Sequence, residues 1–126
     1  MNKQIVIGTL VLAEVRHFLE VMGESSFSND EEVADAGSMA EYYNFTYAEL
    51  KVLSDKVLNA KVGKYARIDF SFKEAVLMYG ELDNRYDIES SNSYESNDDE
   101  AKMARRLKAV MDRFVQAFGK DVTRKR

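Results

Sequence analysis

Apolar positions recur at helical spacing over residues 9–22 and predict the first long helix of the chain. Val11, Val15, Phe18 and Met22 recur three or four residues apart, so they share one helix face. Leu12 and Leu19 lie beside them and complete the stripe. Gly23 is a suitable residue to end this helix. Residues 4–8 are rich in β-branched side chains, so they either extend the helix or form a short strand.

Residues 23–30 have the composition of a loop, and a short helix is predicted after them. Ser28 or Asn29 is a suitable cap for a helix that begins at Asp30. Acidic residues in the first turn favour the helix dipole. Val33, Ala36, Met39 and Ala40 give this helix a narrow apolar face, which Gly37 weakens.

Thr46 and Glu49 have the spacing of a capping box, in which each residue binds the backbone N–H of the other. The pair predicts a helix from Tyr47 to Lys61. Its inward positions are Leu50, Leu53, Val57 and Leu58, and Gly63 follows its end.

Residues 64–72 change to alternating apolar and polar positions, which predicts a half-buried strand. One strand is not stable alone, so a partner is expected at residues 4–12, at residues 75–80 or in another copy of the chain. Against the strand, Ser71 and Glu74 form a second capping box that favours a helix.

The last third of the chain predicts one more long helix, over residues 99–118 and ending at Gly119. Its buried stripe is Met103, Leu107, Val110, Met111, Phe114 and Phe118. Before it, residues 89–97 are too polar to order themselves and are predicted to form a mobile acidic loop. After it, residues 120–126 are predicted to be a frayed basic tail.

These elements predict a single domain over residues 1–126, mainly α, with four to five helices and with or without a short strand pair. An α+β fold with strands at residues 4–8 and 64–72 is the alternative. The chain has 126 residues and is 45% hydrophobic, enough for one core. No cysteine is present, which excludes disulfides and is consistent with a cytoplasmic location. The longest apolar run, residues 5–13, is too short to span a membrane.

Charge is distributed in blocks, although the net charge is only −4. Residues 17–50 contain eight acidic residues and no Lys or Arg. Residues 102–126 contain nine basic residues and two acidic ones. The blocks either neutralise one another, within the fold or in a homo-oligomer, or present a charged face to a partner.

The acidic block also holds the densest group of aromatic residues, and such residues are common at protein interfaces. We therefore expect a small non-catalytic interaction protein, such as an adaptor, an inhibitor or an assembly factor, that meets a basic surface of another protein. Mimicry of nucleic acid by a phage-type inhibitor of host defence is one form of this. The expected contact residues are Asp30, Glu31, Glu32, Asp35, Tyr42, Tyr43 and Phe45. Packing of the aromatics in the core is the alternative for these rings.

A nucleic-acid-binding accessory protein is the second hypothesis, because the last predicted helix carries basic residues that can contact phosphates. These residues are Lys102, Arg105, Arg106, Lys108 and Arg113.

A metal-dependent all-α enzyme is the third hypothesis. Glu14 and His17 have the spacing of a carboxylate and an imidazole in di-iron bundles. His17 is the single histidine, however, and the chain has no second motif of this kind. No catalytic residue, metal or cofactor is therefore predicted.

Overall fold

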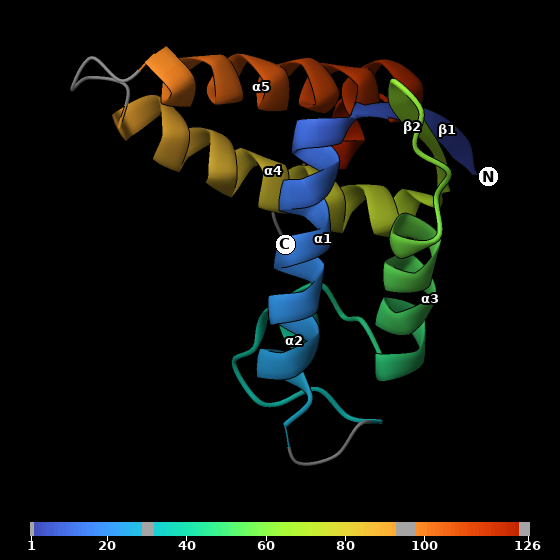
Figure 1. Ribbon diagram of the computed structural model, residues 1–126. Helices are drawn as coiled ribbons and strands as arrows, with labels where there is room; N and C mark the ends of the chain where they lie inside the picture. The colour runs from blue at the N-terminus through green and yellow to red at the C-terminus, as the bar shows by residue number, and fades with distance from the viewer. Residues whose placement is uncertain (1, 29–31, 93–97, 124–126) are drawn as a thin grey trace.

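The computed structural model describes residues 2–28, 32–92 and 98–123 (Figure 1). In this part of the chain the protein is mainly helical, with one two-stranded antiparallel sheet. The elements, in order, are β1 (Lys3–Gly8), α1 (Thr9–Ser26), α2 (Met39–Tyr42), α3 (Tyr47–Leu58), β2 (Tyr65–Phe70), α4 (Phe72–Asn92), α5 (Asp98–Phe118) and the 3₁₀ turn η2 (Lys120–Thr123). The predicted mainly α fold with a short strand pair is confirmed.

Helices α4 and α5 form a hairpin that lies along one side of the molecule (Figure 1). Helix α1 crosses this pair and projects beyond it beside α3, and the two strands lie at the end of the hairpin near α3. Strand β1 packs against α5, while η2 packs between α4 and α5. The two ends of the described chain are therefore both held by the hairpin.

The strand pair buries one face because its apolar residues alternate with polar ones. Ile5 pairs with Ile68 and Ile7 pairs with Ala66, and all four side chains are buried. From the sequence, the strand and the Ser71 capping box are alternatives, but the structure contains both. Ser71 alone separates β2 from α4, so the strand ends where the helix cap begins.

A continuous apolar core joins the sheet to the helices. The rings of Phe70 and Phe114 lie 5.3 Å apart and connect β2 with α5. The guanidinium of Arg113 also donates a hydrogen bond of 2.8 Å to the carbonyl oxygen of Val6. A side chain of α5 therefore satisfies a backbone acceptor of β1.

Helix α1 is longer than predicted, since it continues through Gly23 to Ser26. Tertiary contacts explain the difference, because Ser26 and Phe27 are both buried. The Ser26 hydroxyl accepts from the backbone N–H of Ala40 at 3.3 Å, and the Ser26 carbonyl accepts from the N–H of Asp35 at 2.7 Å. These bonds stabilise the last turn of α1.

The predicted helix beginning at Asp30 is wrong in the part that is described. Residues 32–37 form turns and irregular backbone, and the helix α2 begins only after Ser38, whose hydroxyl accepts from the N–H of Glu41. Gly37 has a φ of +79°, which lies outside the right-handed α-helical region. The backbone therefore cannot continue as one helix through Gly37, and the expected apolar face does not form. Asp30 and Glu31 lie outside the described residues.

Two boundaries near the C-terminus also differ from the prediction. Helix α4 extends to Asn92 along α5, so residues 89–92 are helical and not part of a loop. Residues 93–97 lie outside the described chain, and their mobility stays a prediction. The tail is ordered through Thr123, because Val122 is buried against α4 and α5; residues 124–126 are outside the described chain. Gly119 ends α5 as predicted, with a φ of +83°.

Helix α3 begins at the predicted capping box but ends at Leu58, three residues earlier than expected. The N–H of Glu49 donates to the Thr46 hydroxyl at 3.2 Å, and the N–H of Thr46 donates to the Glu49 carboxylate at 3.1 Å. Arg16 of α1 binds the carbonyl oxygens of Val57 and Leu58, which places a cation at the end of α3.

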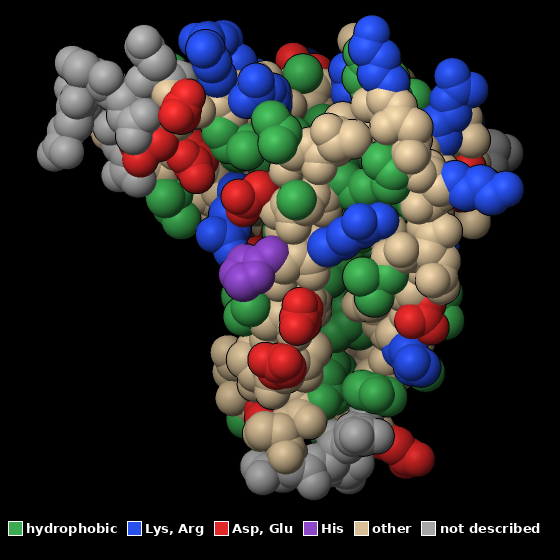
Figure 2. Space-filling view, in the orientation of Figure 1, with side chains coloured by type: hydrophobic (Ala, Val, Ile, Leu, Met, Phe, Trp, Pro, Cys, Tyr) green, Lys and Arg blue, Asp and Glu red, His purple; other side chains and the backbone are tan. Residues whose placement is uncertain are grey.

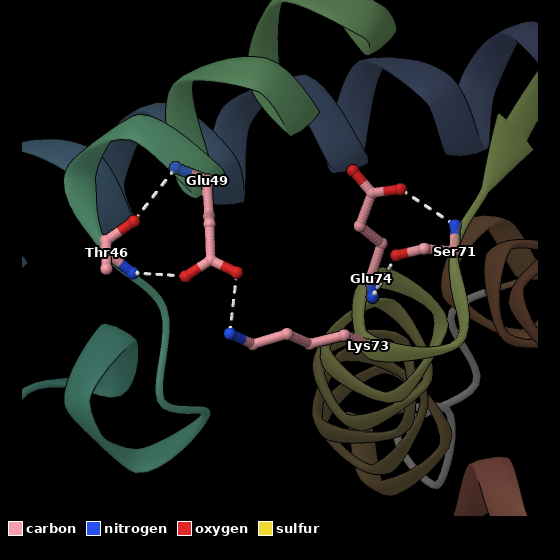
Figure 3. A network of polar contacts seen from close by, with 5 residues as sticks. All are labelled: Thr46, Glu49, Ser71, Lys73 and Glu74. Atoms are coloured by element: carbon pink, nitrogen blue, oxygen red, sulfur yellow. Dashed lines mark hydrogen bonds and ion pairs between the residues drawn. The ribbon is translucent and has the colours of Figure 1, made fainter.

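Two ion pairs join α3 and α4 at their capping boxes, and Figure 3 shows both boxes with the Lys73–Glu49 pair. At α4, Ser71 and Glu74 bind each other's backbone N–H at 3.1 and 2.8 Å. Lys73 of α4 binds Glu49 of α3 at 2.6 Å, and Lys56 of α3 binds Glu74 of α4 at 2.7 Å. The start of each helix is thus tied to a lysine of the other.

Replacing Thr46 with Ala should lower the free energy of unfolding by about 0.5–2 kcal/mol, because the first turn of α3 loses one hydrogen-bond acceptor. Urea unfolding measures the change. Thr46→Ser keeps the hydroxyl and should cost less. An unfolding free energy equal to that of the wild type in the Ala variant would mean that this cap contributes nothing.

The same cap should depend on pH. The Lys73 side chain, followed by the Thr46 N–H, lowers the pKa of Glu49 in the folded protein. The stabilisation is therefore present above the unfolded-state pKa of about 4.3 and is lost as the pH falls through the lower folded pKa. Glu49→Ala should consequently cost less unfolding free energy in acid than at neutral pH, because the carboxylate that accepts from the Thr46 N–H and from Lys73 is then already protonated.

Candidate functional site

The structure separates the residues that the sequence grouped as a partner contact. Tyr43 and Phe45 are buried in the core, whereas Tyr42 is 42% exposed. Glu32 is exposed, but the carboxylate of Asp35 accepts hydrogen bonds from the backbone and the hydroxyl of Ser28. For Tyr43 and Phe45, the alternative of packing in the core is what the structure shows.

Tyr42 lies at the mouth of a cavity of about 200 Å³ between α2, α4 and η2, which we call the tyrosine pocket. Residues far apart in the sequence form its walls. They are Met39, Tyr42, Tyr43, Val76, Tyr79, Gly80, Asp83, Asn84, Val122 and Thr123. Met39 is 38% exposed, so the rim presents both an aromatic and a thioether side chain to the outside.

Tyr43 and Gly80 form the floor of the tyrosine pocket. A Cβ atom at position 80 would collide with the Tyr43 hydroxyl and would lie 3.0 Å from its Cζ atom. Gly80 therefore permits α2 to approach α4 closely. The Tyr42 ring packs edge-on against Tyr43, with ring centroids 5.0 Å apart and an angle of 86° between the planes.

Two acidic residues of α4 lie close to this floor. Asp83 lines the pocket, and Glu81 has one buried carboxylate oxygen that finds no hydrogen-bond partner within the described part of the chain. Burial raises the pKa of Glu81, and Arg85 partly opposes the change. Burial, followed by the charge of Glu81, raises the pKa of Tyr43, so the phenol stays protonated. Asp83 is therefore the carboxylate of this pocket that can attract a cationic ligand.

Sequence reasoning missed the half of the pocket that α4 supplies. Val76, Tyr79, Gly80 and Asp83 follow the spacing of one helix face. A glycine in the middle of a helix between Tyr79 and Glu81 was the signal, because glycine weakens a helix unless a close contact requires it. What contacts that glycine was not readable from the chain.

The basic residues predicted on the last helix fall into two groups on α5. Lys102, Arg106 and Arg113 lie within about 40° of one another around the helix. Arg105 and Lys108 lie on a neighbouring stripe, where Lys108 pairs with Asp112 at 3.5 Å. In Figure 2, several Lys and Arg side chains gather over α5 and beside β2, whereas acidic side chains and the single His lie over α1.

The described residues contain no group of three or more His, Cys, Asp or Glu side chains that is arranged to hold a metal ion. Nor does any helix in this part of the chain have the length and apolar character needed to cross a bilayer. A comparison of the chain with known protein families, with curated proteins and with solved structures finds no match.

Proposed function

We propose that the protein is a non-catalytic interaction protein that captures a basic side chain of a partner protein in the tyrosine pocket. The observation that supports this best is the exposed Tyr42 at the rim of a cavity whose wall contains Asp83. Aromatic side chains in concave, partly apolar sites are typical of the residues that dominate protein interfaces.

The chemistry of the walls favours Lys or Arg over an apolar side chain. The alkyl stem of such a residue can lie along Met39 and Val76, while its charged end reaches the carboxylate of Asp83. Tyr42 and Tyr79 offer ring faces that attract a cation.

Site-specific crosslinking tests the proposal. A photoreactive phenylalanine analogue at position 42 should capture one protein from the native host reproducibly, because position 42 lies at the pocket rim. The same analogue at position 52, where Val52 is 59% exposed on α3, is the matched control. Equal capture from both positions would mean that the crosslinks are non-specific and would contradict the proposal.

The captured partner then allows a quantitative test. Tyr42→Ala should weaken binding by about 2 kcal/mol, the loss expected when an aromatic residue that dominates an interface is truncated. Asp83→Asn should weaken it less as salt rises past about 0.15 M, because screening reduces a charge contact. Asp69→Asn removes an equal charge from an exposed position of β2 and should leave the affinity unchanged. If Asp69→Asn and Asp83→Asn weaken binding alike, only the overall charge matters.

A further inference from the structure

A second cavity, of about 320 Å³, lies at the junction of β1 and α1 and shares no residue with the tyrosine pocket. Its cationic walls come from two other parts of the chain. Lys64 precedes β2, while Arg106 and Arg113 lie on α5. We call this cavity the basic pocket. Its described lining residues include three cations and no carboxylate.

Two of these cations are presented by the fold in a definite way. Arg113 is held by its hydrogen bond to the carbonyl oxygen of Val6, so its guanidinium stays beside the cavity. Arg106 lies two helical turns earlier on the same side of α5, and the small Ala109 between them leaves room. Arginine side chains bind the oxygens of phosphate in pairs of parallel hydrogen bonds.

The backbone at this junction adds to the positive potential of the cations. Gly8, the residue before α1, provides no side-chain cap, and the first turn of α1 contains no acidic residue. Gly8 to Val11 line the cavity, so the N-terminal end of this 18-residue helix, where the helix dipole is positive, lies at the cavity. Both contributions favour an anion.

We propose that the basic pocket binds a backbone phosphate of a single-stranded nucleic acid. A free phosphate ion would occupy only the cavity, but the basic side chains of α5 continue beyond the cavity. Lys102 continues the stripe of Arg106 and Arg113, which spans about 17 Å along α5. That length accommodates several successive phosphates. Tyr65, which lines the cavity and is 51% exposed, offers a ring on which an unpaired base can stack.

This function goes beyond the proposed protein contact and does not depend on it, because the two sites have no residue in common. The carboxylate of Asp83 in the tyrosine pocket would repel a phosphate, so the strand is confined to the β1, β2 and α5 side. The net charge of −4 therefore does not oppose local binding.

Fluorescence anisotropy with a labelled 12-nucleotide oligothymidine, at about 50 mM salt, measures the affinity directly. Arg106→Gln should weaken binding about tenfold, because a charge-assisted contact is lost. It should also reduce the slope of log K against log salt by about 0.7. Lys51→Gln removes an equal charge from an exposed side chain of α3, outside the cavity; it is the matched control and should change the affinity less than twofold. Equal losses in the two variants would overturn the site.

A second pair of variants tests the cavity without removing any cation. Gly8 has an ordinary extended backbone with φ −69°, and a Cβ atom there meets nothing within 4 Å. Gly8→Asp and Gly8→Asn are therefore both expected to fold, which thermal unfolding checks. Asp places a carboxylate at the phosphate position and should abolish binding, whereas Asn adds the same bulk without charge. If the Gly8→Asp variant binds oligothymidine as tightly as the Gly8→Asn variant, the proposal is wrong.

Tyr65 distinguishes a strand from a free anion. Tyr65→Ala should weaken oligothymidine binding about tenfold through lost stacking, while Tyr65→Phe keeps the ring and should bind like the wild type. The concentration of inorganic phosphate that displaces half of the oligothymidine, corrected for the affinity of each protein, should be the same for the wild type, Tyr65→Ala and Tyr65→Phe. An unchanged affinity in Tyr65→Ala, or binding to phosphatidylserine vesicles without binding to the oligonucleotide, would overturn the assignment to a nucleic-acid strand.

Discussion

Replacing Gly80 with Ala should destabilise the protein by about 2 kcal/mol, because the added methyl group overpacks the contact between α4 and Tyr43. The sign is opposite to the usual one, since Gly→Ala inside a helix normally gains about 0.5–1 kcal/mol. At position 80 the new Cβ would meet the Tyr43 hydroxyl and Cζ, while Tyr43 itself is held in the core. Urea unfolding of the two proteins measures the difference.

Gly23 provides the matched control, because it also lies inside a helix. A Cβ atom there meets only Leu50 Cδ2, at 4.0 Å, so Gly23→Ala should stabilise the protein by about 0.5–1 kcal/mol. Tyr43→Phe removes the hydroxyl group that obstructs position 80. Gly80→Ala should therefore cost less in the Tyr43→Phe background. A stabilising Gly80→Ala, or a cost that Tyr43→Phe leaves unchanged, would show that the close contact does not exist.

Removing the carboxylate of Glu74 should cost about 2–3 kcal/mol of unfolding free energy, because its hydrogen bonds are largely screened from water. One oxygen accepts from the Ser71 N–H at 2.8 Å and from the Lys56 ammonium at 2.7 Å. The Glu74 side chain is 9% exposed and the Lys56 side chain 24%. Glu74→Ala therefore leaves both a helix cap and a partly buried cation without a partner.

Glu49 is the internal comparison for Glu74, since it occupies the same position of the other capping box and also pairs with a lysine. Its side chain and that of Lys73 are each 41% exposed, so Glu49→Ala should cost only about 1 kcal/mol. A double-mutant cycle with Lys56→Met isolates the Glu74–Lys56 pair. Equal costs at Glu49 and Glu74 would mean that burial adds nothing to the second network.

The candidate sites were predictable only in part. The acidic block and its tyrosines led to Tyr42, and the stripe on the last helix led to Arg106 and Arg113. Both cavities also need residues from elsewhere. The tyrosine pocket requires Asp83 on α4, and the basic pocket requires Lys64 before β2. Side chains separated by tens of residues carry no local pattern that reveals their proximity.

The sequence by itself determined the elements whose signals are local. The capping box at Thr46 depends on side chains three residues apart, so it specified where α3 begins; the box at Ser71 has the same local basis and indicated a helix there as the alternative to the strand. The apolar stripe of α5 and Gly119 specified that helix for the same reason.

Tertiary structure decided whatever depends on distant partners. Residues 4–8 form a strand because residues 65–70 pair with them. Helix α1 continues beyond Gly23 because Ser26 accepts hydrogen bonds from the backbone N–H groups of Asp35 and Ala40. Tertiary packing also decided which aromatic residues are exposed. Tyr42 stays exposed, whereas Tyr43 packs on Gly80 and Phe45 is buried in the core. Local propensities are worth a few tenths of a kcal/mol to about 1 kcal/mol per residue, whereas burying one large apolar side chain is worth about 1.5–3 kcal/mol. Packing therefore prevails wherever the two conflict.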